Sequence, residues 1–346
     1  MTPIHLIVCF LIFFCSQAQA NVTGVCSNCH VMHASSAGVV SGIGPQEGLL
    51  NSTCLGCHTG TNTDGTSHTP YVYSGVAITD LTTSLAAGNF YFSDSTSQRY
   101  GHNPQELPGG VDSTLNAPPG WITGFSVNDQ VGTINNAVGA TKLSCSGVYG
   151  CHGRHNGSGG LFGLEASHHN NITNNIGMDQ STTGKSFRFL YGIKGWESGN
   201  YQFNDDATDY NIYYSENRAS DAATDTATIS YFCAECHGIF HSGESSQQGV
   251  SEDGSAFSSP WIRHPVDVQM PTGTTEYNSY VYTPAIPVGS NDISNGTITV
   301  ASERIVMCLS CHRAHASPYY SSLRWNYRGA SGSWTNGCAA CHTEKN

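Results

Sequence analysis

The sequence predicts a loop-rich fold with short helices, a few short strands and little regular secondary structure. Charged residues make up only 11% of the 346 positions, whereas an ordinary soluble domain carries about 25%. Glycine occupies 39 positions, and no segment shows the sustained apolar periodicity of a long amphipathic helix. These features exclude coiled coils, long-helix bundles and charged disordered tails. The net charge of −12 argues against a nucleic-acid binder, which needs a basic surface.

The first residues resemble a secretory signal. An apolar run over 4–14 is followed by Ala18-Gln19-Ala20, which fits an A-x-A cleavage site. The run is shorter than the roughly 20 apolar residues that span a bilayer, and we expect no integral membrane span later in the chain. We predict a cleaved signal peptide at 1–20 and a single domain at 21–346. An uncleaved anchor or a lipidated Cys15 are the alternatives.

Cysteines and histidines carry the chemical information. Ten cysteines form five C-x-x-C-H motifs. Two thiols at this spacing can add across the two vinyl groups of haem, and the adjacent histidine then ligates the iron from the proximal side. A disulfide framework would not explain a histidine after every second cysteine, and zinc fingers need paired C-x-x-C motifs at finger spacing. The cysteine pairs are Cys26 and Cys29, Cys54 and Cys57, Cys233 and Cys236, Cys308 and Cys311, and Cys338 and Cys341, followed by His30, His58, His237, His312 and His342.

A sixth site has a longer spacer. Cys145 and Cys151 enclose five residues, and His152 follows. Gly147 and Gly150 would allow this spacer to bulge outward, so that the thiols reach one haem. A local Cys145–Cys151 disulfide, with His152 idle, is the alternative. We favour the haem because it uses all twelve cysteines that follow the signal, and we therefore expect six covalent c-type haems.

Further histidines are available as distal ligands. Nine remain after the signal and the six proximal positions, and six irons need a sixth ligand. We expect methionine to be a distal ligand at a site or two at most, because few methionines are present. His68 and His155 are the weakest candidates. Histidines three or four residues after a proximal one share its helical face and could ligate a neighbouring haem. The predicted distal ligands are His33, His102, His168, His169, His241, His264 and His315.

The expected haems explain the unusual composition. Each macrocycle is a large apolar plate, so the cofactors would form much of the core and short helices would carry the attachment motifs. Residues 277–307 are the exception, because Tyr280–Tyr282 and Thr297–Val300 are β-rich and flank a turn at 289–292. We predict a β-hairpin there.

With these motifs, the chain resembles the secreted multihaem c-type cytochromes of metal-respiring bacteria. The resemblance rests on the C-H-x-x-H doublets His30/His33 and His312/His315, on the Cys145 to His152 spacing, and on short segments at 88–90, 101–103 and 167–169. It implies a stacked array of bis-histidine haems wrapped by the chain. Some members polymerise into filaments in which one haem takes its distal histidine from the next subunit.

Electron transfer is the function that these expectations favour. An iron closed on both axial sides cannot bind substrate, so we expect no enzymatic activity. We expect secretion to the periplasm, the outer cell surface or an extracellular filament. The expected partners are redox partner cytochromes, further copies of the chain, and mineral or metal-ion acceptors, with no nucleic acid. The alternative is an oxidoreductase that reduces a small oxyanion at one open-coordinate haem.

Overall fold

The computed structural model describes a part of the chain. The described residues are 25, 27, 30, 52–60, 71–75, 87–93, 98–109, 118–119, 143–146, 149–153, 187–190, 192–197, 208, 210–217, 226–241, 264–273, 275–294, 296–298, 303–327 and 337–344. The predicted signal peptide lies outside these residues. No helix in the described ranges combines the length and the apolar character that a membrane span requires.

The helices are short, and the haem-attachment motifs form most of them. α1 (Cys54–Cys57), α4 (Cys308–Cys311) and α5 (Cys338–Cys341) are single turns that begin and end at the two cysteines of a motif. α2 (Ile229–His237) includes a whole motif, and the side chain of Thr228 caps it by accepting a hydrogen bond from the Tyr231 N–H. α3 (Thr275–Asn278) carries no cysteine. The 3-10 helices are η3 (Phe90–Phe92), η4 (Gln98–Tyr100), η6 (Phe187–Phe189), η7 (Gly238–Phe240) and η9 (Tyr320–Ser322).

The strands form three two-stranded pairs in the described part of the chain. β3 (Gly195–Trp196) with β4 (Ile212–Tyr213), and β5 (Val268–Gln269) with β6 (Ile305–Val306), are antiparallel. β1 (Ser144–Ser146) and β2 (Gly150–His152) are parallel. With so few and such short elements, the predicted loop-rich fold is confirmed.

The predicted hairpin at 277–307 is wrong. Tyr280–Tyr282 and Thr297–Ile298 are not strands, and β6 pairs instead with β5. Tyr280 is buried in an apolar cluster, and its hydroxyl donates to the Ile286 carbonyl at 2.8 Å. The aromatic and branched residues that suggested strands in this segment are therefore buried in an apolar cluster. Their backbone turns and does not pair as strands.

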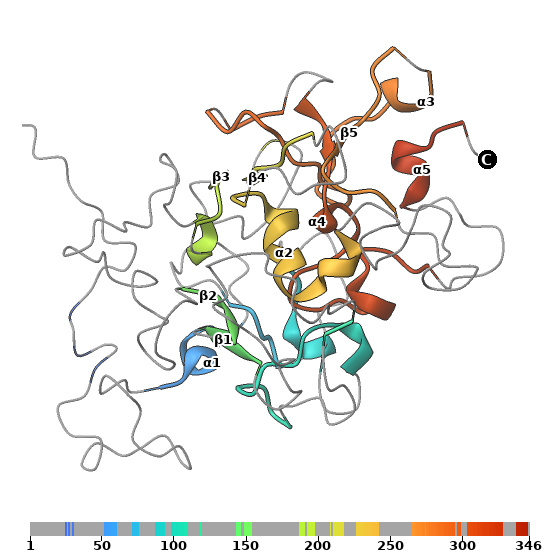
Figure 1. The fold of residues 1–346 in the computed structure, drawn as a ribbon. Helices are drawn as coiled ribbons and strands as arrows, with labels where there is room; N and C mark the ends of the chain where they lie inside the picture. Colours follow the sequence, from blue (N-terminus) through green and yellow to red (C-terminus); the bar gives the residue numbers. More distant parts are fainter. Residues whose placement is uncertain are drawn as a thin grey trace, which may run out of the picture.

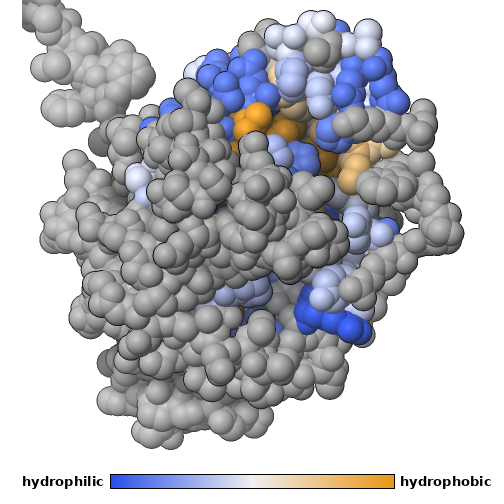
Figure 2. Space-filling model, turned by 45° about the vertical axis from the view of Figure 1, so that its right-hand side comes forward, coloured by the Kyte–Doolittle hydropathy of each residue, from blue (hydrophilic) through white to orange (hydrophobic). Residues whose placement is uncertain are grey.

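Three apolar clusters stabilise the described residues. One surrounds Phe187 and Met307, a second surrounds Tyr280 and Ile212, and a third contains Leu55, Phe90 and Ala316 together with Leu107. On the face shown in Figure 2 the described residues are mostly hydrophilic, and hydrophobic residues are visible in a limited area near the top. The clusters join segments far apart in sequence, which places the attachment motifs next to one another.

Candidate haem-binding sites

The attachment motifs cross the molecule in chain order. From the lower left of Figure 1 to the upper right, α1, the β1–β2 pair, α2, α4 and α5 follow one another. Each of these elements carries the cysteines of one motif, so five motifs lie along one path. Cys26 and Cys29 of the first motif lie outside the described residues.

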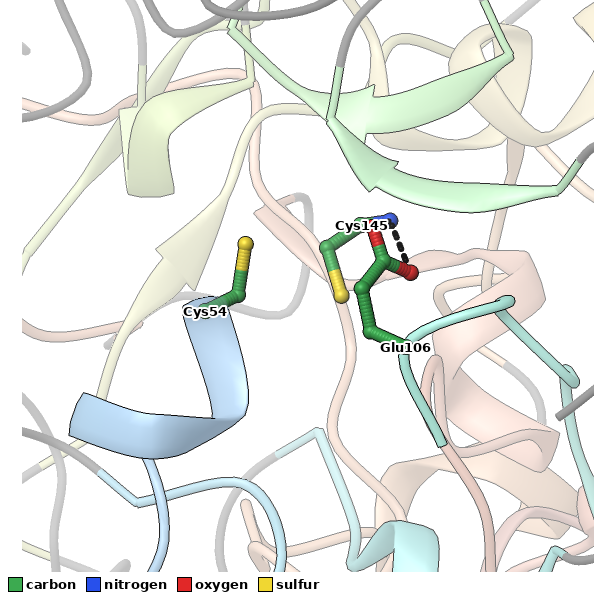
Figure 3. A group of neighbouring side chains, drawn as sticks. All are labelled: Cys54, Glu106 and Cys145. Atoms are coloured by element: carbon green, nitrogen blue, oxygen red, sulfur yellow. Dashed lines mark hydrogen bonds between the residues drawn. The ribbon is translucent and has the colours of Figure 1, made fainter. Parts of the chain in front are cut away.

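The first contact on this path joins α1 to β1. Cys54, at the start of α1, and Cys145, on β1, point toward each other beside Glu106 (Figure 3). The Glu106 carboxylate accepts hydrogen bonds from the Cys145 backbone N–H at 3.2 and 3.3 Å. The Cys145 S–H donates to Cys54, which raises the pKa of Cys145 and lowers that of Cys54. With haem attached these sulfurs become thioethers, so their contact indicates that two macrocycles would be neighbours.

The sixth motif places its two cysteines on adjacent strands. Cys145 and Cys151 do not form a disulfide in the structure, and haem attachment at this pair stays a prediction. The parallel pairing of Ser144 with Gly150 and of Ser146 with His152 brings the two cysteines level on adjacent strands. A Cβ on Gly150 would lie 2.4 Å from backbone atoms of Ser146, so only glycine fits this tight connection. The strand pair replaces the helical turn that the two-residue spacers form elsewhere.

The remaining contacts extend the path to α5. The Cys233 thiol donates to Cys308, which together with desolvation raises the pKa of Cys233. Desolvation raises the pKa of Cys236, and the nearby Cys151 raises it further. The motifs at 145–152 and 233–237 therefore each interact with the motif before and the motif after them.

The last step on the path joins α4 to α5. Desolvation and the charges of Cys341 and Cys338 raise the pKa of Cys311 to about 12. The motif that ends at His342 therefore lies beside the one that ends at His312.

Three pairs of imidazoles have their ring centres at a separation that fits an iron between them. A metal–imidazole bond is about 2 Å long, and the ring centre lies ~1 Å behind the nitrogen, so two axial rings on one iron should have centres about 6 Å apart. Each pair joins a proximal histidine to a predicted distal one. The ring centres are 6.2 Å apart for His152 and His315, 6.0 Å for His237 and His102, and 6.2 Å for His342 and His264.

The opposite nitrogen of most of these rings is held by the protein. An Nδ1–H that donates to an oxygen leaves the lone pair of Nε2 available to a metal and fixes the ring plane. Five rings donate to backbone carbonyls: His102 to Ala314 (2.7 Å), His152 to Arg188 (3.2 Å), His237 to Pro119 (2.6 Å), His264 to Pro265 (2.8 Å) and His312 to Ser321 (2.8 Å). His342 has a carboxylate partner instead, Glu276, at 2.9 Å.

The surrounding protein favours the neutral form of four of the imidazoles. Desolvation lowers the pKa of His237 to about 4, assisted by the charge of His102, and lowers the pKa of His315 to about 3, assisted by His152. Desolvation also lowers the pKa of His102 and of His312. A neutral imidazole is the form that ligates iron, so these rings are prepared for metal binding.

The predicted distal ligands His102 and His315 are joined to each other. Gly101 forms an antiparallel bridge with Ala316, and the His102 N–H donates to the His315 carbonyl at 3.0 Å. His315 is oriented by the Phe90 ring, which stacks on it at 4.5 Å. A Cβ on Gly101 would lie 2.4 Å from both the Ala316 Cβ and the His315 carbonyl oxygen. We call the segment pair 101–102 and 314–316 the distal bridge.

His241 has a different partner. Its Nε2 lies 2.9 Å from the Asp267 carboxylate, and both side chains are buried. An iron at this Nε2 would have to displace the carboxylate, so the structure favours a packing role, although ligation of iron by His241 stays a prediction. The other predicted distal ligands, His33, His168 and His169, lie outside the described residues, as do His68 and His155. The partners of His30, His58 and His312 also stay predictions.

We expect Asp267→Ala to destabilise the protein without changing its haem spectrum. The substitution removes the acceptor of His241 and of the Thr228 hydroxyl, which lies 3.4 Å away, and leaves buried polar groups unsatisfied. A loss of about 1–3 kcal/mol is expected. Thermal unfolding of the holoprotein measures it, with the exposed Glu344→Ala as the control. Unchanged stability, or a new high-spin haem, would contradict a purely structural His241–Asp267 pair.

Sequence reasoning missed the residues that position the ligands. Glu106, Glu276 and Gly101 belong to no motif, and their roles depend on contacts between distant segments. Gly101 gave a weak signal because it precedes His102 in a turn-like segment. Nothing in the sequence around Glu276 points to His342.

Comparisons with known proteins agree with the motif analysis. A family model described as "Doubled CXXCH motif" matches residues 300–346. No curated protein matches. Two similar solved structures are the outer membrane cytochrome S filament from Geobacter sulfurreducens, at 20% identity, and the OmcS nanowires from the same organism, at 21%. For each, the TM-score is 0.45, and the alignment covers 89% of this chain and 85% of the other. The C-x-x-C-H motifs indicate several covalent c-type haems.

Proposed function

We propose that this protein transfers electrons through a row of six bis-histidine c-type haems. The observation that carries the proposal is the set of three imidazole pairs whose ring centres lie 6.0–6.2 Å apart, each including the proximal histidine of one attachment motif. Bound haem iron would supply one-electron exchange between the ferric and ferrous states. The chain supplies the thiols that fix each group, the imidazoles that close both axial positions, and the protein contacts that hold neighbouring sites together.

The ligand set supports transfer rather than catalysis. Two imidazoles leave no axial position for a substrate, and they favour lower potentials than a methionine and histidine pair. Five of the six rings in these pairs are held through Nδ1, and the sixth, His315, is held by stacking on Phe90. An oxyanion reductase would need one iron with an open side.

Contacts between the histidines support continuity of the row. His315 interacts electrostatically with His152 across its own site, with His102 of the following site and with His58 of the preceding one. His237 likewise interacts with His102 and with His312. The sites of motifs 54–58, 145–152, 233–237 and 308–312 are therefore close neighbours, the arrangement that stepwise transfer between haems requires.

We also propose that the two ends of the row exchange electrons with other molecules outside the cell. α5 lies at one end of the row (Figure 1), and the His342 side chain is 25% exposed. Further copies in a filament, redox partner cytochromes, and mineral or metal-ion acceptors are the proposed partners. Electron microscopy of the secreted protein tests the filament, and solely monomeric particles would contradict it.

Intact mass and spectroscopy of the mature protein test the proposed function. Six added haems, fully low-spin iron, and no spectral shift with cyanide or nitrite are expected. Cys145→Ser/Cys151→Ser should remove one haem from the mass. A colourless protein would refute the proposal, and a high-spin iron that binds nitrite would favour the oxyanion reductase.

A further inference from the structure

Glu276 stands out among the groups that hold the histidines. Its carboxylate Oε1 lies 2.9 Å from the Nδ1 of His342, the proximal histidine of the last motif. Elsewhere in the described part of the chain, His102, His152, His237, His264 and His312 each have a backbone carbonyl at this position. The last site therefore differs from its neighbours by one full negative charge on the far side of its proximal ligand.

The contact is built by a dedicated element. Glu276 lies on α3, the one described α-helix without a cysteine, and hydrogen bonds join this segment to the residues that follow α5. The Thr343 hydroxyl donates to the Glu276 carbonyl, and the Ser279 hydroxyl donates to Thr343 at 3.0 Å. These bonds hold the carboxylate beside His342, and the Glu276 side chain is only 19% exposed.

A carboxylate partner at Nδ1 changes the basicity of the Nε2 atom that binds the metal. A hydrogen bond to an ionised acceptor is roughly twice as strong as one to a neutral acceptor. It draws the Nδ1 proton away from the ring, raises the basicity of Nε2 and so stabilises the more positive state of the metal. Partners of this kind that touch a ligand rather than the metal typically change metal affinity or activity by about 10–100-fold.

We propose that Glu276 is a positioning residue that lowers the reduction potential of the haem held by His342 and His264. The proposal rests on the proposed function, since it assumes a bis-histidine haem at the last motif. It makes this site more difficult to reduce than it would be with a carbonyl partner. Electrons that reach this end of the row would then leave it readily toward a partner.

Spectroelectrochemical titration of the Glu276→Gln holoprotein tests the proposal. The amide is nearly the same size but carries no charge. We expect one of the haems to shift at least tenfold toward the ferrous form at a fixed potential, which is about 59 mV for a one-electron couple. The electron paramagnetic resonance signal of one low-spin haem should shift as well. The other haems should titrate as before.

Glu344→Gln is the matched control. Glu344 is exposed, lies two positions after His342 and undergoes the same chemical change. Glu344→Gln should leave the haem reduction potentials nearly unchanged if the hydrogen bond to His342 sets the potential. A mere loss of negative charge near this haem should then have little effect. The proposal is overturned if no haem shifts in Glu276→Gln, if Glu344→Gln shifts one equally, or if Glu276→Gln turns a haem high-spin or loses it. A parent protein without a low-spin haem at this motif would instead refute the proposed function.

Discussion

Replacing His315 by Ala is expected to turn one haem high-spin and reactive, while the haem count stays the same. His315 faces His152 at 6.2 Å between ring centres, and the attachment cysteines of that site are untouched by the change. The iron would lose its sixth ligand and gain an open side that the parent protein lacks. About one-sixth of the iron should then bind cyanide, which the visible spectrum and electron paramagnetic resonance measure directly.

His241→Gln is the matched control for this variant. His241 is a buried histidine whose Nε2 contacts Asp267. We expect it to lose stability and to keep every haem low-spin. If His315→Ala stays fully low-spin, the assignment of His315 to the site of His152 is wrong. If His241→Gln becomes high-spin, His241 is a ligand after all.

Gly101→Val is expected to disturb two haems at once. Its side chain would collide with Ala316 and with the His315 carbonyl, at positions where even a Cβ would be 2.4 Å away. Overpacking of this kind typically costs about 1–3 kcal/mol. Because Gly101 and Ala316 pair within the distal bridge, separation would displace both His102 and His315. The high-spin fraction should therefore be about twice that of His315→Ala, accompanied by a lower Tm.

Gly273→Ala is the control for Gly101→Val. It separates the collision with Ala316 from the general cost of replacing a glycine. Gly273 has a φ of +82° and no atom within 4 Å of an added Cβ, so the change strains the backbone without a collision. We expect a loss of about 1 kcal/mol and an unchanged spectrum. A Gly101→Val protein with the spectrum of the parent would show that the distal bridge does not hold the ligands.

The attachment chemistry could be predicted from sequence because it is local. A C-x-x-C-H motif places two thiols and an imidazole within one turn of chain, and α1, α4 and α5 are such turns. The loop-rich fold could also be predicted, since the low charge and the missing helical periodicity leave few long elements. His102, His264 and His315 each lie about 6 Å from a proximal histidine, and their role as ligands stays a prediction.

Pairings between distant segments could not be predicted. The site of His152 meets a histidine from the C-terminal part of the chain, and no local pattern records which one. The prediction of a hairpin was wrong for the same reason. Tyr280 and Ile298 are residue types that favour strands, but here they are buried in an apolar cluster that other segments complete. His241 and His315 each follow a proximal histidine at a similar spacing, so the sequence does not distinguish them. The difference in the structure is the Asp267 carboxylate beside His241.

The distal bridge has a consequence for how the protein matures. Because His315 comes late in the chain while the cysteines of its site come near the middle, the macrocycle there could be attached well before its second axial ligand has emerged. Long-range contacts of this kind form slowly. Because one backbone pairing carries both His102 and His315, we expect the two histidines to reach their positions together, late in folding.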